Sequence, residues 1–436
     1  MFPATRPLRL PSPRRPAQGP ARGLALILAG VLALAGGVPA AAAGELTSTP
    51  VVALAPLDRA RAEMNQRVFD RVWSEVRTQY YDPSIHGLDW TEARRTYRPD
   101  ALAARDDGQL YRVIDQMLDL LDDDHAGAAP PAVARRQDAQ RRRRAVMGVT
   151  LYPQDGGGYR IDRVRPGSPA EAAGVRVGWR LAGDGSGGWS PDREVVDGRP
   201  LTLAFTDTEG VRRDVTLTPR EMDPLPAFVA DRSRPDVLVL RIEGFEPGLG
   251  RWMGAQLADL SPDTAVVLDM RDNPGGLLME ADAVLSCFLP DRMAWATRTN
   301  RSGRSATLRV QEACGGRLDP ATNALAVLVD GSSRSAAELT PAALQEAGRA
   351  IVVGERTAGA VLISQDTPLP DGGRLTLSRA DFVTAGGVRL EKRGVDPDLV
   401  IADAEGEPGM VDEALLAAIA ALRTTSAAVG ARPDVN

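Results

Sequence analysis

The stretch that decides the fold of this chain is Val327-Leu328-Val329-Asp330-Gly331-Ser332-Ser333-Arg334-Ser335-Ala336-Ala337-Glu338-Leu339. The apolar run 324–329 predicts a buried strand of a parallel sheet. A tight turn and an Ala-rich amphipathic helix follow, so Ser335 is expected at a helix N-terminus, where free N–H groups would favour a serine nucleophile and its oxyanion. The spacing from Ser335 to Glu338 is also that of a capping box, so this stretch alone leaves a nucleophile and a structural cap both open.

The 436-residue chain is too long for one hydrophobic core, and composition shifts along it predict several parts. We expect a signal peptide at 1–43, a linker at 44–56, a helical segment with a basic linker at 57–144, a β-rich domain at 145–222, an α/β core at 223–424 and a disordered tail at 425–436.

The N-terminal segment carries five arginines, then an apolar run and small residues ending at Ala43, which is the pattern of an export signal. The apolar run is short for a membrane span, so we expect a periplasmic or secreted product, with an uncleaved membrane anchor as the alternative. Arg14-Arg15 leaves Sec and twin-arginine export both open. Cleavage removes those five arginines and no acid, so the net charge falls from −6 to −11, which argues against nucleic-acid binding.

Two cysteines, Cys287 and Cys314, can pair in an oxidising compartment or remain buried thiols, and their spacing does not decide between these states. They do not form a metal-binding pattern. The acidic turn 122–124 lacks the spacing of an EF-hand. The sequence therefore predicts no metal and no cofactor.

Helical periodicity extends over 57–121 and ends in the polar turn Asp122-Asp123-Asp124-His125-Ala126-Gly127. The basic run 135–144 has no aromatic residues and is interpreted as a solvated linker, with a patch that binds an anionic surface as the alternative. An amphipathic helix is expected at 411–422 near the C-terminus. Past Thr424 we expect disorder.

The β-rich segment resembles a PDZ domain in Gly148-Val149-Thr150-Leu151, Pro166-Gly167-Ser168-Pro169-Ala170 and Val196-Asp197-Gly198. The resemblance implies that Gly148, Val149, Thr150 and Leu151 bind the C-terminus of a peptide or unfolded protein through backbone N–H groups and a strand edge. Trp179, where an Asp is usual, and the Gly-rich insert 183–188 depart from the pattern.

The α/β segment predicts strands at 237–242 and 265–269 and a helix at 278–288. Between the second strand and the helix lies Pro274-Gly275-Gly276. This turn either admits a ligand close to its backbone or is only a tight connection.

In order, these segments resemble the serine peptidase family of the C-terminal processing (tail-specific) proteases, the tricorn core and the interphotoreceptor retinoid-binding protein repeats. The resemblance rests on 269–276, similar to a DxRxNxGG element, on 333–338, similar to SASASE, and on 348–355 and 394–398. It implies a crotonase-like ββα core with Ser335 as nucleophile. It also implies an oxyanion hole formed by the N–H groups of Gly275, Gly276 and Ala336.

The processing proteases pair their serine with a lysine 25 positions later, where this chain has Ala360. Lys392 is the only lysine, and an arginine cannot act as the base near neutral pH. The tricorn-like branch uses a histidine and a glutamate instead. By that resemblance His125 is the general base and Glu391 orients it, while His86 is a loop residue.

The sequence therefore predicts an exported serine endopeptidase. The missing lysine and the PDZ-like segment motivate one alternative, a catalytically inactive peptide-binding scaffold. A small-ligand binder like the retinoid-binding repeats is a third possibility, which the PDZ-like segment disfavours.

Overall fold

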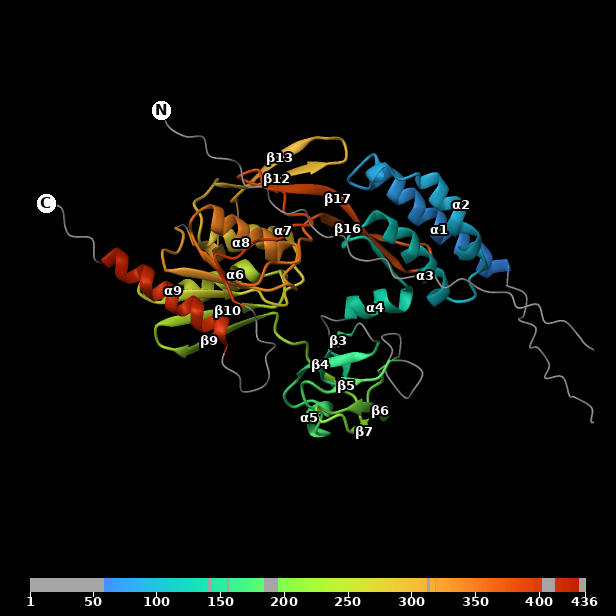
Figure 1. Ribbon diagram of the computed structural model, residues 1–436, viewed down its shortest axis with the longest axis horizontal. Coiled ribbons are helices and arrows are strands. Elements are labelled where there is room, and N and C mark those ends of the chain that lie inside the picture. Colours follow the sequence, from blue (N-terminus) through green and yellow to red (C-terminus); the bar gives the residue numbers. More distant parts are fainter. Residues whose placement is uncertain are drawn as a thin grey trace, which may run out of the picture. The chain divides into compact units, whose positions relative to one another are not determined.

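The computed structural model describes residues 59–139, 143–154, 157–183, 195–311, 314–317, 319–401 and 412–430. All of them belong to one unit that spans 56–436. The segments expected to be a signal peptide, 1–43, and a linker, 44–56, and most of the Gly-rich insert lie outside the described residues. Figure 1 shows the arrangement of the elements.

The core is organised around a six-stranded sheet with the strand order β18-β15-β14-β11-β10-β9. Its strands are β9 Phe228–Arg234, β10 Val237–Ile242, β11 Ala265–Asp269, β14 Leu325–Val329, β15 Ile351–Gly354 and β18 Leu399–Val400. All neighbouring pairs are parallel except β9 with β10. The fully buried β14 lies in the interior of this sheet, which explains its unbroken apolar sequence and confirms the predicted strand.

Helices cover both faces of this sheet. Side chains alternate between the two faces along each strand, and those of the central strands are apolar on both. Leu238, Leu240 and Ile242 of β10 belong to the cluster that also contains residues of the helices on one face, whereas Val237 and Val239 pack with the helix on the other. The first face carries α6 Leu249–Leu257, α7 Leu278–Ser286 and α8 Ala336–Glu346, and the second carries α9 Glu413–Gly430. The α/β class is thereby confirmed.

A second, antiparallel sheet connects the core with the N-terminal helices. Its strands are β1 Gly127–Ala129, β12 Ala294–Asn300, β13 Ser305–Arg309, β16 Ile363–Pro368 and β17 Arg374–Thr384. The helical elements that precede it are α1 Arg59–Gln79, η1 Ile85–Gly87, α2 Trp90–Ala103, α3 Asp107–Leu118 and η2 Asp119–Leu121. Their apolar faces pack against Leu375 and Leu377 of β17. Strand β1, which directly follows the His125 turn, pairs with β17 and so attaches that turn to the core.

The β-rich segment forms a five-stranded antiparallel sheet in the order β3-β4-β5-β6-β7, around its own apolar cluster. Its elements are β3 Val149–Pro153, β4 Tyr159–Val164, α5 Pro169–Ala172, β5 Arg180–Leu181, β6 Leu201–Thr206 and β7 Arg212–Leu217. The strand before this sheet in the chain, β2 Arg144–Val146, pairs antiparallel with the strand after it, β8 Arg220–Met222. Among the described residues, strand β3 pairs only with β4, so its other side is a sheet edge there.

Two expectations about local structure were wrong. The first half of the basic run lies in helix α4 Pro131–Ala139 rather than in a linker, because Pro131 starts a helix and the alanines and arginines sustain it. Helix α9 continues to Gly430, so the disorder expected past Thr424 does not hold for 425–430, while 431–436 lie outside the described residues.

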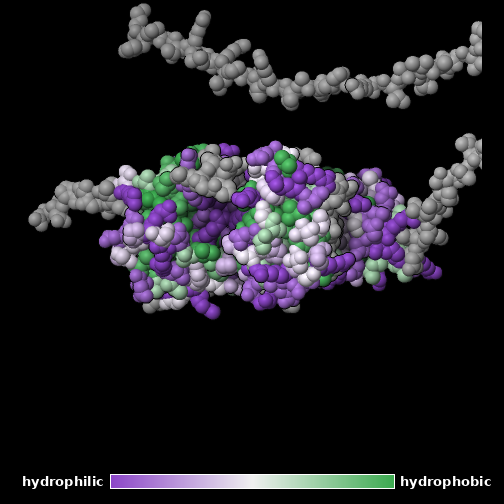
Figure 2. All heavy atoms as spheres, turned by 90° about the horizontal axis from the view of Figure 1, so that it is seen from below, coloured by the Kyte–Doolittle hydropathy of each residue, from purple (hydrophilic) through white to green (hydrophobic). Residues whose placement is uncertain are grey.

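Cys287 and Cys314 form a disulfide that joins the end of α7 to the short helix η3 Cys314–Gly316. Both cysteines are buried in the core cluster, so of the two states that the sequence left open the structure has the paired one. In the described residues no helix combines the length and the apolar character needed to cross a membrane. The face drawn in Figure 2 is a mixture of hydrophilic and hydrophobic residues.

Candidate active site

Ser335 lies between β14 and α8, at the carboxyl end of the parallel strand. Its backbone has φ 55° and ψ −116°, a conformation that costs a non-glycine residue of order 1–3 kcal/mol and must be held in place by its surroundings. The Ser335 N–H donates to the carbonyl of Ala360 at 2.8 Å and to Glu338 Oε2 at 3.0 Å. Two fixed acceptors therefore maintain the strained turn.

Glu338 is a completely buried carboxylate one helical turn after Ser335. Besides the Ser335 N–H, it accepts hydrogen bonds from Thr357 Oγ1 at 2.5 Å and from the N–H groups of Gly359 and Ala360 at 2.7 and 2.9 Å. Burial raises the pKa of Glu338, and these hydrogen bonds oppose the rise. The carboxylate thus fastens the loop 357–360 to the start of α8.

The Pro274-Gly275-Gly276 turn packs directly against Ser335. Gly275 has φ 96°, and a Cβ atom there would lie 2.7 Å from the Cβ of Ser335 and 3.2 Å from the nitrogen of Ala336. At Gly276, a Cβ would lie 2.4 Å from the carbonyl oxygen of Phe245. Both positions therefore require glycine, which explains the Gly-Gly pair by close approach of backbones.

The buried Asn273 fixes this turn. Its Nδ2 donates to the Ile242 carbonyl at 2.7 Å, its Oδ1 accepts the Gly275 N–H at 2.8 Å, and its carbonyl accepts the Arg334 N–H at 2.9 Å. In this unliganded structure the N–H of Gly275, one of the three expected oxyanion donors, is thus engaged by Asn273. In the described part of the chain, the N–H groups of Gly276 and Ala336 donate to no acceptor.

His125 lies in the turn between η2 and β1, where its N–H donates to Asp123 Oδ1 at 2.9 Å. The Nδ1 atom of its ring is buried without a hydrogen-bond partner. Burial lowers the pKa of His125, the carboxylates of Asp123 and Asp124 oppose this, and the cations of Arg334 and Lys392 add to it. The imidazole therefore lies within electrostatic range of Arg334, the residue before Ser335.

Glu391 is buried on the loop that precedes β18, and its Oε2 accepts the Val361 N–H at 2.9 Å. Burial raises the pKa of this carboxyl. The charge of Asp123 adds to the rise, while Arg389 and Lys392 oppose it. Glu391 is thus held beside the loop that contacts Ser335, and within electrostatic range of the turn that carries His125.

Lys392 links the three segments. Its ammonium lies 3.1 Å from Asp124 and 3.4 Å from Asp122, on either side of Asp123 in the His125 turn. The backbone N–H of Lys392 donates to the carbonyl of Gly359 at 2.7 Å, and Gly359 directly precedes Ala360. The segments of Ser335, His125 and Glu391 are therefore neighbours, although no direct hydrogen bond joins these three side chains in the described structure.

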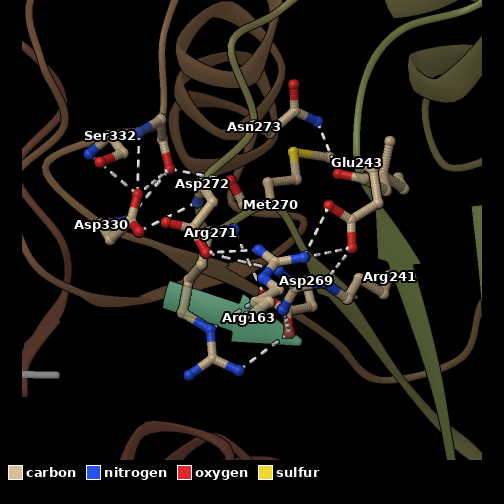
Figure 3. Close-up of polar contacts among 12 residues, drawn as sticks. Arg163, Arg241, Glu243, Asp269, Met270, Arg271, Asp272, Asn273, Asp330 and Ser332 are labelled. Atoms are coloured by element: carbon tan, nitrogen blue, oxygen red, sulfur yellow. Dashed lines mark hydrogen bonds and ion pairs between the residues drawn. The ribbon is translucent and has the colours of Figure 1, made fainter. Parts of the chain in front are cut away.

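Figure 3 shows an ionic network that reaches the Pro-Gly-Gly turn from the β-rich domain. Arg163 of β4 contacts Glu243 at 3.1 Å and Asp272 at 2.8 Å, and Arg241 of β10 contacts both acids as well. Asp272 directly precedes Asn273, and its N–H donates to Asp330 at 2.9 Å. The turn before Ser335 and the turn after β11 are thus joined to each other and to the β-rich domain.

The residues expected to bind peptide lie at the exposed edge of the β-rich sheet. Gly148 has φ 91°, and a Cβ there would lie 2.0 Å from that of Ser168. Val149, Thr150 and Leu151 begin the edge strand β3. Strand β3 is thus the terminal strand of this sheet among the described residues. Among the described residues, no group of three or more His, Cys, Asp or Glu side chains is arranged to hold a metal ion.

Comparison with known proteins agrees with this architecture. Residues 236–401 match the model of peptidase family S41, and residues 61–119 match that of the tricorn protease C1 domain. The core of this chain belongs to peptidase family S41.

The relatives of this S41 peptidase include the carboxyl-terminal-processing protease of Picosynechococcus sp., which is 29% identical over 371 residues, or 80% of this chain and 87% of that protein. Tricorn protease homolog 1 of Streptomyces coelicolor is also 29% identical, over 83% of this chain and 36% of its own length. Among solved structures, the photosystem II D1 C-terminal processing protease has the same fold, with a TM-score of 0.54 and 24% identity over 78% of this chain and 93% of that one. The protein is a serine peptidase related to the C-terminal processing proteases.

Two features of this S41 site were missed by reasoning from the sequence. Glu338 was interpreted only as part of a capping box, and Lys392 was considered only as a base. The ion pairing of Lys392 could have been predicted from the sequence, because a lone lysine and the three successive acids before His125 are natural ion-pair partners. Position 360 has a different use here, since the carbonyl of Ala360 binds the Ser335 N–H.

Proposed function

We propose that this S41 peptidase is an endopeptidase that hydrolyses peptide bonds in exported proteins or peptides, with Ser335 as nucleophile, His125 as general base and Glu391 as the carboxylate that orients His125. The observation that carries the proposal is the strained Ser335 turn packed against Gly275, with the His125 turn held beside it through Lys392. Such strain at a serine that follows a buried strand is characteristic of functional sites.

The chemistry follows from which atoms are already occupied. His125 Nδ1 is buried, which leaves Nε2 as the ring nitrogen to accept the Ser335 hydroxyl proton. Glu391 Oε2 is bonded to Val361, whereas Oε1 accepts no hydrogen bond within the described residues and suits the Nδ1–H of His125. The pair would close when substrate orders the site, since catalytic hydrogen bonds are often long in unliganded enzymes.

Oxyanion stabilisation would come from Gly276 and Ala336, whose N–H groups are not used within the described structure. Ala336 is the first residue of α8, so the positive end of the helix dipole adds to its N–H. Gly275 acts as a spacer in this scheme, because its lack of a side chain allows the turn to approach Ser335.

Substrate delivery would use the PDZ-like edge strand. A peptide or unfolded tail would add to β3, with its terminal carboxylate at the loop of Gly148. Export to the periplasm or the exterior is supported by the N-terminal sequence pattern and by the disulfide between Cys287 and Cys314, a bond that persists in oxidising compartments.

A fluorophosphonate probe tests the assignment, because it labels only activated serines. Wild type and the neighbouring control Ser332→Ala are expected to be labelled and to cleave unfolded protein, whereas Ser335→Ala does neither. His125→Ala is expected to slow labelling by about 10⁴-fold, and Glu391→Gln is expected to slow it at least tenfold. Labelling that survives in Ser335→Ala excludes the nucleophile, unchanged rates in His125→Ala exclude the base, and a wild type that neither labels nor cleaves excludes the proposed activity.

A further inference from the structure

Arg334 stands directly before the proposed nucleophile, at a position where the SASASE element has an alanine. Its side chain is exposed, while Ser333 on the preceding side is buried. A long, exposed cationic side chain therefore stands next to the proposed nucleophile.

The backbone of Arg334 is fixed against the oxyanion turn. Its N–H donates to the Asn273 carbonyl at 2.9 Å, and its carbonyl accepts the Ala337 N–H at 3.0 Å. The same carbonyl lies 2.8 Å from where a Cβ of Gly275 would be. The start of the side chain is therefore positioned as firmly as that of Ser335.

The guanidinium of Arg334 has no carboxylate partner among the described residues, unlike the other cations of this region. Lys392 pairs with Asp122 and Asp124, and Arg389 pairs with Asp381. Nearby acids are occupied as well, since Asp272 pairs with Arg163 and Arg241, and Asp330 accepts the N–H groups of residues 272, 332 and 333. Within the described residues, Arg334 is thus a cation at the site that is available to a ligand.

We propose that Arg334 binds a carboxylate of the substrate close to the scissile bond and makes this peptidase selective for such bonds. The carboxylate has two possible sources, an acidic side chain next to the cleaved bond or the terminal carboxylate of a short tail. A guanidinium matches either, because its parallel N–H groups bind both oxygens of a carboxylate at once. This inference rests on the proposed function, since it takes the Ser335 turn as the place of cleavage.

The influence of Arg334 on His125 supports this placement. The Arg334 cation contributes to the lowered pKa of the imidazole, so the two side chains lie within electrostatic range of each other. A substrate carboxylate bound to Arg334 would reduce that influence. Substrate binding would then move His125 towards a stronger base.

The test compares matched peptides once cleavage sites have been mapped by mass spectrometry. One series carries Asp against Asn, or Glu against Gln, on each side of the cleaved bond. A second series keeps the sequence and compares a free terminal carboxylate with an amide. We expect kcat/KM for wild type to be about tenfold higher for the acid in one series, the lower range for a hydrogen-bonded charge pair at an exposed site. The series that responds identifies the source.

Two variants and a control separate this role from structural effects. In Arg334→Ala the acid-to-amide ratio of kcat/KM is expected to fall to about one, and in Arg334→Glu it is expected to fall below one. The control Arg304→Ala, an exposed arginine between β12 and β13, should keep the wild-type ratio. Equal rates for acid and amide in a wild type that is labelled at Ser335 would overturn the role of Arg334 and leave the nucleophile intact.

A binding measurement makes the two proposals separable even without turnover. Fluorescence anisotropy of the acid and amide peptides with wild type and Arg334→Ala reports carboxylate recognition directly. A preference for the acid that is lost in Arg334→Ala supports the inference whether or not Ser335 reacts. Equal affinities of both peptides for both proteins would overturn it.

Discussion

The ammonium nitrogen of Lys392 lies 3.1 Å from a carboxylate oxygen of Asp124, the residue that precedes His125. This contact attaches the turn of the proposed base to the loop of Glu391, across 268 positions of sequence. Both side chains are about half exposed, so the pair contributes about 1 kcal/mol or less to stability. Its effect is expected on the position and the charge of His125.

The pH dependence of kcat/KM is expected to show an acid limb with a midpoint below 6.5. His125 must be neutral to accept a proton, and burial lowers its pKa, so activity rises as pH increases through that lowered value and then reaches a plateau. Lys392→Met removes a cation that also lowers this pKa. The acid limb should therefore move to higher pH in that variant, as measured with a fluorogenic peptide.

Lys392→Arg keeps the positive charge and serves as the matched control, with its acid limb at the wild-type position. An acid limb that does not move in Lys392→Met would contradict the electrostatic coupling of Lys392 to His125.

Gly275→Ala is expected to lower kcat/KM at least 100-fold, because its Cβ would push into Ser335 and displace the oxyanion turn. Gly372→Ala is the matched control: Gly372 has φ 92°, close to the 96° of Gly275, but no atom lies within 4 Å of its added Cβ. Both variants carry a similar backbone strain of about 1–2 kcal/mol. Steady-state kinetics and denaturant unfolding of the two variants should therefore separate the effect of backbone strain from that of the steric clash with Ser335. Equal activity in both variants would argue against the clash.

Glu338→Gln is expected to lower the free energy of unfolding by about 2–3 kcal/mol, because one acceptor oxygen becomes an NH₂ group facing N–H donors in the interior. Probe labelling of Ser335 should slow as well, since Glu338 holds the Ser335 N–H. Glu209→Gln, at an exposed carboxylate between β6 and β7 that accepts no hydrogen bond within the described residues, should cost less than 1 kcal/mol. Denaturant unfolding and labelling rates of the two variants give the comparison, and equal losses would refute the special role of Glu338.

The double variant Cys287→Ala/Cys314→Ala is expected to lose about 3.5 kcal/mol of unfolding free energy, from the chain entropy released when a loop spanning 27 positions is no longer closed. Denaturant unfolding with and without reductant measures this loss, and thiol titration of the unfolded wild type should find no free thiol. Two titratable thiols, or a stability that does not respond to reductant, would contradict the disulfide.

Local sequence was sufficient for the elements around Ser335. The apolar run 324–329 predicted β14, and the Pro-Gly-Gly pattern marked the tight connection from β11 to α7. These predictions succeed because strand burial and turn geometry depend on near neighbours. The prediction of a linker at 135–144 was wrong where helix α4 extends into it, because the charge of this run was given more weight than its helix propensity.

The sequence by itself determined the α/β class, the place of Ser335 at the end of a strand and the absence of a lysine at position 360. Only the tertiary structure decided that the Gly275 N–H donates to Asn273, that Glu338 is an anchor for the loop of Ala360, and that Lys392 connects the segments of His125 and Glu391. It also decided that the cysteines pair. The physical reason is that hydrogen bonds, ion pairs and steric exclusion act over a few ångströms in space, and the chain brings these residues within that range only after it has folded.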